Sequence, residues 1–240
     1  MYFPKIKKYQ KKFDYTYAFG AYPVLDLLKN QSDKIYTILF KQKSLESEGI
    51  KEIQSICKQK DINTQINTRL IDKISVKENT YVVGVFKKYK SNIEKDNNHL
   101  VLVNPSNKGN IGTIIRTMLG FKFEDLAIIG PSVDIFDPMV VRATMGGLFG
   151  IRFQHFESIE KYILKFPKQN LYTFMLNGKK EIKEVNFKKP FSIVQGNESR
   201  GLDDTYLDMG ESVYISHSKD IDSLNLSVAT SISLWEASKK

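Results

Sequence analysis

The stretch HLVLVNPSNKGNIGTIIRT, residues 99–117, decides the fold class of this chain. Its first five residues, His99–Val103, form a short apolar run typical of a buried strand. A turn rich in asparagine and glycine follows, and the apolar spacing after Gly112 predicts a helix to Leu119. A strand that runs through such a turn into a helix is the repeating unit of parallel α/β sheets.

The same alternation continues to the end of the chain. We expect a mainly parallel sheet with helices on both faces, because the predicted strands alternate with helices. Ligands of such sheets bind in loops that leave the carboxyl ends of strands. The loops to inspect are therefore 104–112, 176–180, 196–202 and 216–225. The further strands are expected at 126–129, 171–175, 192–195 and 212–215, and the further helices at 138–147 and 226–237.

Before residue 99 the pattern predicts a separate, smaller α/β domain. Helices are expected at 19–29 and 50–60, and strands at 35–40 and 81–86. The segment KSNIEKDNN, residues 90–98, is almost free of apolar residues and is typical of a linker. The predicted organisation is a first domain at 1–90, a linker at 91–98 and a second domain at 99–240.

The positive charge is concentrated in the first domain and linker. Residues 1–98 hold 19 of the 36 lysines and arginines but 11 of the 27 acidic residues, so they carry +8 of the net charge of +9. The first twelve residues contain five lysines and no acidic residue, which favours a mobile basic arm. Such asymmetry is typical of a polyanion-binding module beside a catalytic one. Lysines that only solvate the surface are the alternative.

Composition excludes several classes of protein. The hydrophobic fraction of 41% and charged fraction of 26% are near the averages of soluble globular proteins. No apolar run approaches the roughly 18 residues of a membrane span, and no secretion signal is visible, so we expect a cytoplasmic protein. Cys57 is the single cysteine, which excludes disulfide frameworks and cysteine-rich metal sites within one chain. The three histidines, His99, His155 and His217, lack ligand spacing, and no metal is expected.

The first informative loop is NPSNKGNIGTIIRT, residues 104–117. Gly109 and Gly112 allow the backbone to approach a ligand closely, and free N–H groups at the start of a helix favour anions. Arg116 lies about one helical turn after Gly112, so its guanidinium can reach the same loop. On local grounds, ordinary turn chemistry and a solvated arginine are the more common explanations of this loop.

Two further segments carry polar residues at strand ends or helix starts. IVQGNESRGLD, residues 193–203, places Glu198 and Arg200 between Gly196 and Gly201. It lacks the Lys-Ser/Thr of a P-loop and the glycine fingerprint of dinucleotide sites. In IDSLNLSVATSISLWEA, residues 221–237, Ser223 and Asn225 precede a predicted helix, and Ser223 as its capping residue is the simplest interpretation.

In this order and spacing the three segments resemble motifs 1, 2 and 3 of the SpoU/TrmH family of RNA 2′-O-ribose methyltransferases, which belong to the SPOUT class. The resemblance covers residues 99–240 and includes DPMVVRATMGGLF at 137–149. FGAYPVLDLL at 19–28 and YVVGVFKKY at 81–89 are similar, more weakly, to the L30e-like substrate-binding domain of many relatives. The chain departs from the family pattern at Ser199, where many relatives have glycine, and at Leu119-Gly120-Phe121, where Phe-Gly order is common.

Membership would imply a SPOUT-type α/β knot, in which the C-terminal segment threads through a loop as a deep trefoil. It would also imply a homodimer formed through the knotted domain, and a bent S-adenosylmethionine (SAM) held by the knot loops. By position, the cofactor contacts would be Leu176, Gly196, Ile215 and Leu224. The catalytic constellation would be Asn110, Arg116, Glu198, Ser223 and Asn225.

The resemblance also implies roles for these residues. A guanidinium is a poor base, so we expect Arg116 to position the RNA phosphate and stabilise the developing alkoxide, with a phosphate or water as proton acceptor. Asn110, Ser223 and Asn225 would orient ribose, cofactor and Arg116, and Glu198 would fix the motif 2 loop.

Three interpretations of the function stay open. The two-domain length and the basic first domain favour 23S ribosomal RNA as substrate, with tRNA as the alternative. A non-catalytic RNA-binding or ribosome-assembly protein on an inactive knot is the rival from another class. A dinucleotide-dependent enzyme is disfavoured, because no strand supplies the phosphate-binding fingerprint.

Overall fold

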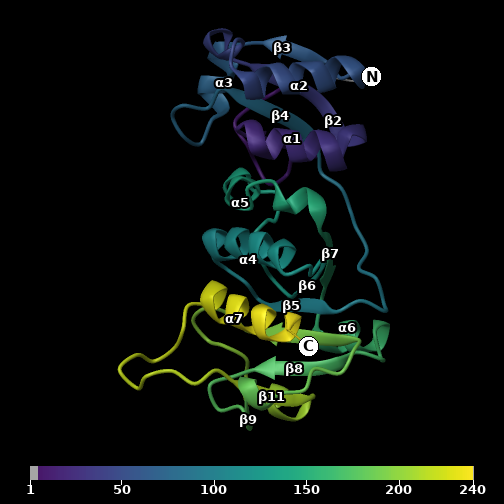
Figure 1. The fold of residues 1–240 in the computed structure, drawn as a ribbon, viewed down its shortest axis with the longest axis vertical. Coiled ribbons are helices and arrows are strands. Elements are labelled where there is room, and N and C mark those ends of the chain that lie inside the picture. The colour runs from purple at the N-terminus through teal and green to yellow at the C-terminus, as the bar shows by residue number, and fades with distance from the viewer. Residues whose placement is uncertain (1–4, 240) are drawn as a thin grey trace. The chain divides into compact units, whose positions relative to one another are not determined.

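The computed structural model describes residues 5–239, shown in Figure 1, so residues 1–4 and 240 of the predicted domains lie outside the described part. Contacts between Cα atoms divide the chain into two compact units. The first unit comprises Met1–Tyr89 together with Asp134–Gly150, and the second comprises Lys90–Val133 together with Ile151–Lys240. The compact units thus differ from the predicted domains in the placement of residues 134–150.

The first unit is built on a four-stranded sheet of order β1-β4-β2-β3. β1, β4 and β2 are antiparallel, and β3 pairs in parallel with β2. Its strands are β1 (Tyr15–Phe19), β2 (Ile35–Phe40), β3 (Thr64–Ile66) and β4 (Val82–Lys87), and its helices are α1 (Ala21–Asn30), α2 (Glu48–Gln59), α3 (Thr68–Ile74) and α5 (Pro138–Ala143), with short 3₁₀ turns at Ser32–Lys34, Gln42–Ser44 and Gly147–Gly150. Every residue of β1 is buried, because both faces of this strand are covered.

Residues 134–150 pack against the first unit through its strand β1. The Thr16 hydroxyl donates to the carbonyl oxygen of Phe136 at 2.6 Å, and Phe136 packs edge-on against Phe86. α5 begins after Asp137, whose carboxylate caps Met139 N–H, and ends at Ala143, before the predicted Gly147. The early end follows from the positive φ angles of Met145 and Gly146, which a right-handed helix cannot accommodate.

The basic segment at the start of the first unit is fixed by contacts with the sheet, unlike the mobile arm that its lysines predicted. Ile6, Tyr9 and Phe13 pack against the core of the unit. The lysine content alone favoured a mobile arm, with a solvated tail as the alternative. The apolar residues between the lysines make the contacts with the core, and a count of charges cannot predict such contacts.

The second unit is a seven-stranded sheet, parallel throughout, of order β7-β6-β5-β10-β8-β11-β9. α4 and α7 pack together, and α6 contacts β6 and β7 (Figure 1). The strands are β5 (His99–Val103), β6 (Asp125–Ile129), β7 (Arg152–Phe156), β8 (Asn170–Phe174), β9 (Lys180–Glu181), β10 (Phe191–Gln195) and β11 (Glu211–Tyr214), the helices are α4 (Lys108–Gly120), α6 (Ile159–Lys165) and α7 (Leu226–Ser238), and 3₁₀ turns lie at Ile182–Glu184 and Asp204–Asp208. The predicted mixed α/β fold with a mainly parallel sheet is confirmed.

The core of this unit explains why β5, β6 and β10 read as continuous apolar runs. Val101, Ala127 and Val194 pack with Ile159 and Tyr162 of α6. Alternate residues such as Leu100, Leu102 and Ile128 are equally buried on the other face. In the described part of the chain, no helix combines the length and apolar character that a bilayer crossing would need.

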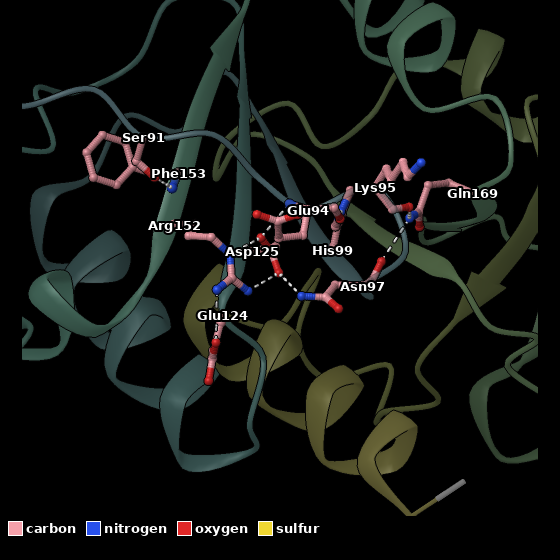
Figure 2. A network of polar contacts seen from close by, with 10 residues as sticks. All are labelled: Ser91, Glu94, Lys95, Asn97, His99, Glu124, Asp125, Arg152, Phe153 and Gln169. Atoms are coloured by element: carbon pink, nitrogen blue, oxygen red, sulfur yellow. Dashed lines mark hydrogen bonds and ion pairs between the residues drawn. The ribbon is translucent and has the colours of Figure 1, made fainter.

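The predicted linker is fastened to the amino-terminal edge of this sheet (Figure 2). The Asp125 carboxylate accepts from Glu94 N–H and Asn97 Nδ2, each at 2.9 Å, and from Arg152 through Nε and Nη2, each at 2.7 Å. Gln169 Nε2 donates to the Asn97 carbonyl oxygen at 2.8 Å. Residues 94–97 are therefore part of a bonded network rather than a free spacer.

Candidate active site

The motif 1 loop is shaped by two asparagines at the carboxyl end of β5. Asn104 adopts a positive φ of 51°, which turns the chain away from the sheet. The Asn107 side chain caps α4 by accepting from Gly109 N–H at 2.8 Å and Asn110 N–H at 3.0 Å. The helix therefore starts at Lys108, four residues before the predicted Gly112, and carries Asn110 in its first turn.

Glu198 ties the motif 2 loop to the motif 1 loop. Its carboxylate accepts from Ser106 N–H at 3.0 Å, Ser106 Oγ at 2.8 Å, Asn107 N–H at 3.0 Å and Asn110 Nδ2 at 3.3 Å. Burial alone raises the pKa of Glu198, but these hydrogen bonds outweigh burial and lower the pKa overall. The group is therefore a fixed anion at neutral pH.

Asn225 connects motif 3 to the same chain of contacts. Its Nδ2 donates to Asn110 Oδ1 at 3.2 Å, while its Oδ1 caps α7 by accepting from Ser227 N–H at 2.9 Å. The capping residue of α7 is thus Asn225, so the interpretation of Ser223 as the cap is wrong. Glu198, Asn110 and Asn225 form one line of hydrogen bonds through all three motifs.

A cavity of about 410 Å³ opens beside this line of hydrogen bonds. All four residues predicted to contact the cofactor line it, namely Leu176, Gly196, Ile215 and Leu224. Glu198 and Ser223 of the predicted catalytic group line it too. The cavity therefore lies where the loops after β8, β10 and β11 meet the start of α7.

Gly196 is required by backbone packing at this cavity. A Cβ atom at this position would lie 2.2 Å from the carbonyl carbon of Gly201 and 2.4 Å from Leu202 N. Both are backbone atoms, so a side chain cannot be accommodated by a rotamer change. The motif 2 loop folds tightly back on itself for this reason, and Asn197 and Gly201 exchange backbone hydrogen bonds.

Arg116 is not brought to the cavity of its own chain. It is exposed on α4, and its guanidinium has no hydrogen bond or ion pair with the residues from 5 to 239. The structure thus joins Glu198, Asn110 and Asn225, places Ser223 at the cavity and leaves Arg116 outside it.

The sequence places Arg200 in the motif 2 loop but assigns no role to it. It is exposed and lines both the 410 Å³ cavity and a neighbouring cavity of about 900 Å³. The second cavity is bounded by the motif 1 and motif 2 loops and by Pro131–Val133 after β6. The predicted set of loops omitted this last one, although the Gly130-Pro131 turn directly after a strand was a usable signal.

Comparisons with known proteins identify relatives of this chain. The model of the SpoU rRNA Methylase family matches residues 97–235. An uncharacterized tRNA/rRNA methyltransferase from Synechocystis is 28% identical over 144 residues, which are 59% of this chain and only 53% of that relative. A putative tRNA (cytidine(34)-2′-O)-methyltransferase from Listeria monocytogenes is 28% identical over 147 residues, covering 58% of this chain and 86% of the relative.

Solved structures extend the likeness to nearly the whole chain. The AdoMet-bound rRNA methyltransferase from Sinorhizobium meliloti superposes with a TM-score of 0.79 at 25% identity, covering 94% of this chain and 87% of that one. The family model spans more than half of the sequence, includes the first two motif segments and covers the third as far as residue 235. The chain therefore belongs to the SpoU rRNA Methylase family.

Proposed function

We propose that this protein is a SAM-dependent methyltransferase that acts on a ribose 2′-hydroxyl of 23S ribosomal RNA. The observation that carries the proposal is the 410 Å³ cavity, which all four predicted cofactor contacts line. Glu198, Asn110 and Asn225 hold the three motif loops around it through hydrogen bonds between their side chains.

The cavity suits SAM in size and chemistry. Its volume lies within the range of roughly 300–1,000 Å³ that small-molecule sites occupy. Leu176, Ile215 and Leu224 offer apolar surface for the adenine, and Leu176 has 68% of its surface exposed although it is apolar, which a ligand would cover. When bound, SAM would supply the methyl group.

The residues around the cavity would align the acceptor and hold its charge. Methyl transfer to an alcohol needs the oxygen in line with the methyl carbon and needs a group to take the hydroxyl proton. Ser223 at the cavity would orient ribose or cofactor. Arg116 would bind the RNA phosphate and stabilise the alkoxide as it forms, with a phosphate or water accepting the proton.

A homodimer through the second unit would complete this site. Arg116 lies outside the cavity of its own chain, so the Arg116 guanidinium of a second copy could serve this cavity instead. α7, which packs beside α4, exposes the apolar residues Val228 and Trp235, as expected for a helix that another chain covers. Mixing Arg116→Ala chains with chains carrying Glu198→Ala would restore activity if the arginine acts across the dimer.

The choice of ribosomal RNA rests on the first unit. Among solved structures, the Sinorhizobium rRNA methyltransferase matches 94% of this chain, whereas the structure described for 2-OH methylation of C/U34 on tRNA matches 60% of it. We assign the first unit the role of an L30e-like RNA-binding domain that selects the substrate in the cytoplasm. A tRNA substrate is the second candidate, supported by the 86% of the Listeria relative that aligns.

The test combines cofactor binding with methyl transfer. Purified protein should bind SAM in a calorimetric titration and transfer labelled methyl groups to ribosomal RNA from cells that lack the gene. Arg116→Ala should bind SAM normally yet lose turnover, because the RNA-phosphate contact and the charge stabilisation are removed while the cavity lining is unchanged. Absence of SAM binding together with tight RNA binding would instead identify a non-catalytic RNA-binding protein, and labelling of tRNA alone would select the second candidate.

A further inference from the structure

Residues 5–13 form a segment without regular secondary structure that we call the basic strap. It carries Lys5, Lys7, Lys8, Lys11 and Lys12, all exposed. The segment lies in the first unit, far along the sequence from the three motifs. Its conformation is fixed although its sequence is strongly polar.

Hydrogen bonds from two β1 tyrosines hold the first half of the strap. The Tyr15 hydroxyl donates to the Lys5 carbonyl oxygen at 3.1 Å and accepts from Lys7 N–H at 3.1 Å. The Tyr17 hydroxyl donates to the Lys7 carbonyl oxygen. Burial raises the pKa of Tyr17, so this hydroxyl keeps its proton as a donor at any physiological pH.

Contacts with Lys88 and Asp134 hold the second half. Lys88 Nζ donates to the Lys11 carbonyl oxygen at 2.8 Å and lies 4.8 Å from the centre of the Tyr9 ring. The Tyr9 hydroxyl donates to the Asp134 carboxylate, which also pairs with Lys88 at 3.3 Å. The Asp134 carboxylate is thus paired with Tyr9 and Lys88 and not with any of the five strap lysines.

The side chains of the strap are sorted by chemistry. Ile6, Tyr9 and Phe13 turn toward the core of the unit, and the Phe13 ring stacks on Tyr15 with 5.1 Å between ring centres. The five lysines between them project to solvent. None of their ammonium groups makes an ion pair or hydrogen bond with another residue of the described chain.

The five ammonium groups form no ion pair within the described residues that would stabilise the fold. Five like charges on nine consecutive residues repel one another, and no acidic side chain of the described residues forms an ion pair with them. An extended polyanion is the partner that would match them, because each phosphate neutralised by a lysine releases condensed counterions. A fixed backbone lowers the ordering cost of such binding.

We infer that the basic strap is a preformed docking site for the phosphate backbone of the substrate RNA. This inference rests on the proposed function for the identity of the polyanion. It assigns RNA affinity to the strap and leaves the methyl-transfer chemistry to the second unit. The strap would hold RNA without reading its bases, since lysine–phosphate contacts carry no sequence information.

The first experiment measures RNA affinity against salt concentration, with ribosomal RNA from cells that lack the gene as the probe. A variant with all five strap lysines changed to glutamine should bind more weakly. The slope of log affinity against log salt should fall by about 3 to 5, roughly one for each lost phosphate contact. The matched control removes the same charge from exposed lysines elsewhere in the first unit: Lys29, Lys51, Lys58, Lys73 and Lys77.

The second experiment separates the fixed backbone from the charge. Tyr9→Phe with Tyr17→Phe removes two hydroxyls that hold the strap but keeps every lysine. The salt slope should stay near that of the wild type, while affinity falls by roughly 3-fold to 10-fold because the strap must now be ordered on binding. An unchanged affinity in a variant that melts like wild type would overturn the claim that the strap is preformed.

The outcomes also separate this inference from the proposed function. If the lysine variant and its matched control have equal slopes while the wild type methylates RNA, the docking site is wrong and the proposed function stands. If SAM is never bound but the strap lysines alone set the slope, the docking site stands and the methyltransferase proposal fails. Circular dichroism of each variant verifies that it is folded.

Discussion

The amino-terminal and carboxyl-terminal edges of the seven-stranded sheet each hold a hydrogen-bonded carboxylate, but the two carboxylates differ in their surroundings. At the amino edge, the Asp125 side chain is 1% exposed and accepts hydrogen bonds from Glu94, Asn97 and Arg152. At the carboxyl edge, Glu198 also accepts from backbone and side-chain donors, namely two N–H groups and the side chains of Ser106, Asn110 and Asn197, but it lines a cavity.

The two edges differ in whether the arginines near the carboxylate have partners of their own. The guanidinium nearest Asp125 is fully engaged, since Arg152 also pairs with Glu124 at 3.2 Å. Beside Glu198, the exposed Arg200 lines the cavity, and its guanidinium has no partner within the described chain; Arg116 is also exposed and unpaired there, but lies outside the cavity. A saturated network indicates a structural role, whereas a free cation beside a cavity indicates binding.

The largest expected effect is that of Glu198→Ala on activity. Two backbone N–H groups and Asn110 would lose an anionic acceptor, and each such bond contributes about 1.5–3 kcal/mol. We expect methyl transfer to fall by about 100-fold or more, because the motif 1 and motif 2 loops separate. Steady-state kinetics on ribosomal RNA measure the loss, and near-normal turnover would remove Glu198 from the site.

Asp125→Asn should lower the stability of the fold and leave activity unchanged, in contrast to Glu198→Ala. One of two anionic oxygens is replaced by a donor that faces Arg152, so we expect unfolding to become easier by about 2–3 kcal/mol, less than for a fully buried pair because Arg152 is partly exposed. Denaturant titration measures this change. Turnover per folded molecule should be unchanged, and a specific loss of kcat would mean that the amino edge also takes part in function.

Acid should weaken the amino edge in a way that depends on Asp125. Burial by itself raises the pKa of this carboxyl, but hydrogen bonds from Arg152, Glu94 N–H and Asn97 lower the pKa overall. A lowered folded pKa gives stability that is present above the unfolded value near 4 and is lost as pH falls through the folded value. Unfolding free energies measured from pH 6 to pH 3 should fall less steeply in Asp125→Asn than in wild type, and parallel curves would contradict this.

The smallest expected effect is that of Arg200→Ala. The side chain lines both carboxyl-edge cavities and has no partner to release in the described structure. We expect KM for RNA to rise by about 3-fold to 10-fold with SAM affinity unchanged, as for loss of one or two charge-assisted contacts. Arg200→Lys should recover part of the loss, whereas equal kinetics in all three proteins would assign Arg200 to solvent.

Much of the second unit could be predicted because its signals are local. β5 has the predicted bounds, His99–Val103, since apolar residues flanked by polar turns define a buried strand. The cofactor residues and catalytic residues came from family resemblance, and their roles stay predictions. Their gathering follows from topology, because parallel strands bring separate loops to one edge.

The features that were missed depend on contacts between distant residues. β7 (Arg152–Phe156) has an exposed His155, and α6 (Ile159–Lys165) is too short for a clear helical pattern. The fixed linker depends on Asp125 and Gln169, far away in sequence. The same holds for the basic strap, where Tyr15 and Tyr17 supply the hydroxyls that hold a lysine-rich segment.

The central claim is that the carboxyl edge transfers a methyl group from SAM to a ribose of RNA. Mass-spectrometric mapping of ribose methylation in total RNA from cells with and without the gene tests it most directly. We predict one 2′-O-methyl group in 23S ribosomal RNA that disappears with the gene, returns with the wild-type gene and does not return with Arg116→Ala. Identical methylation maps in all of these cells would contradict the claim.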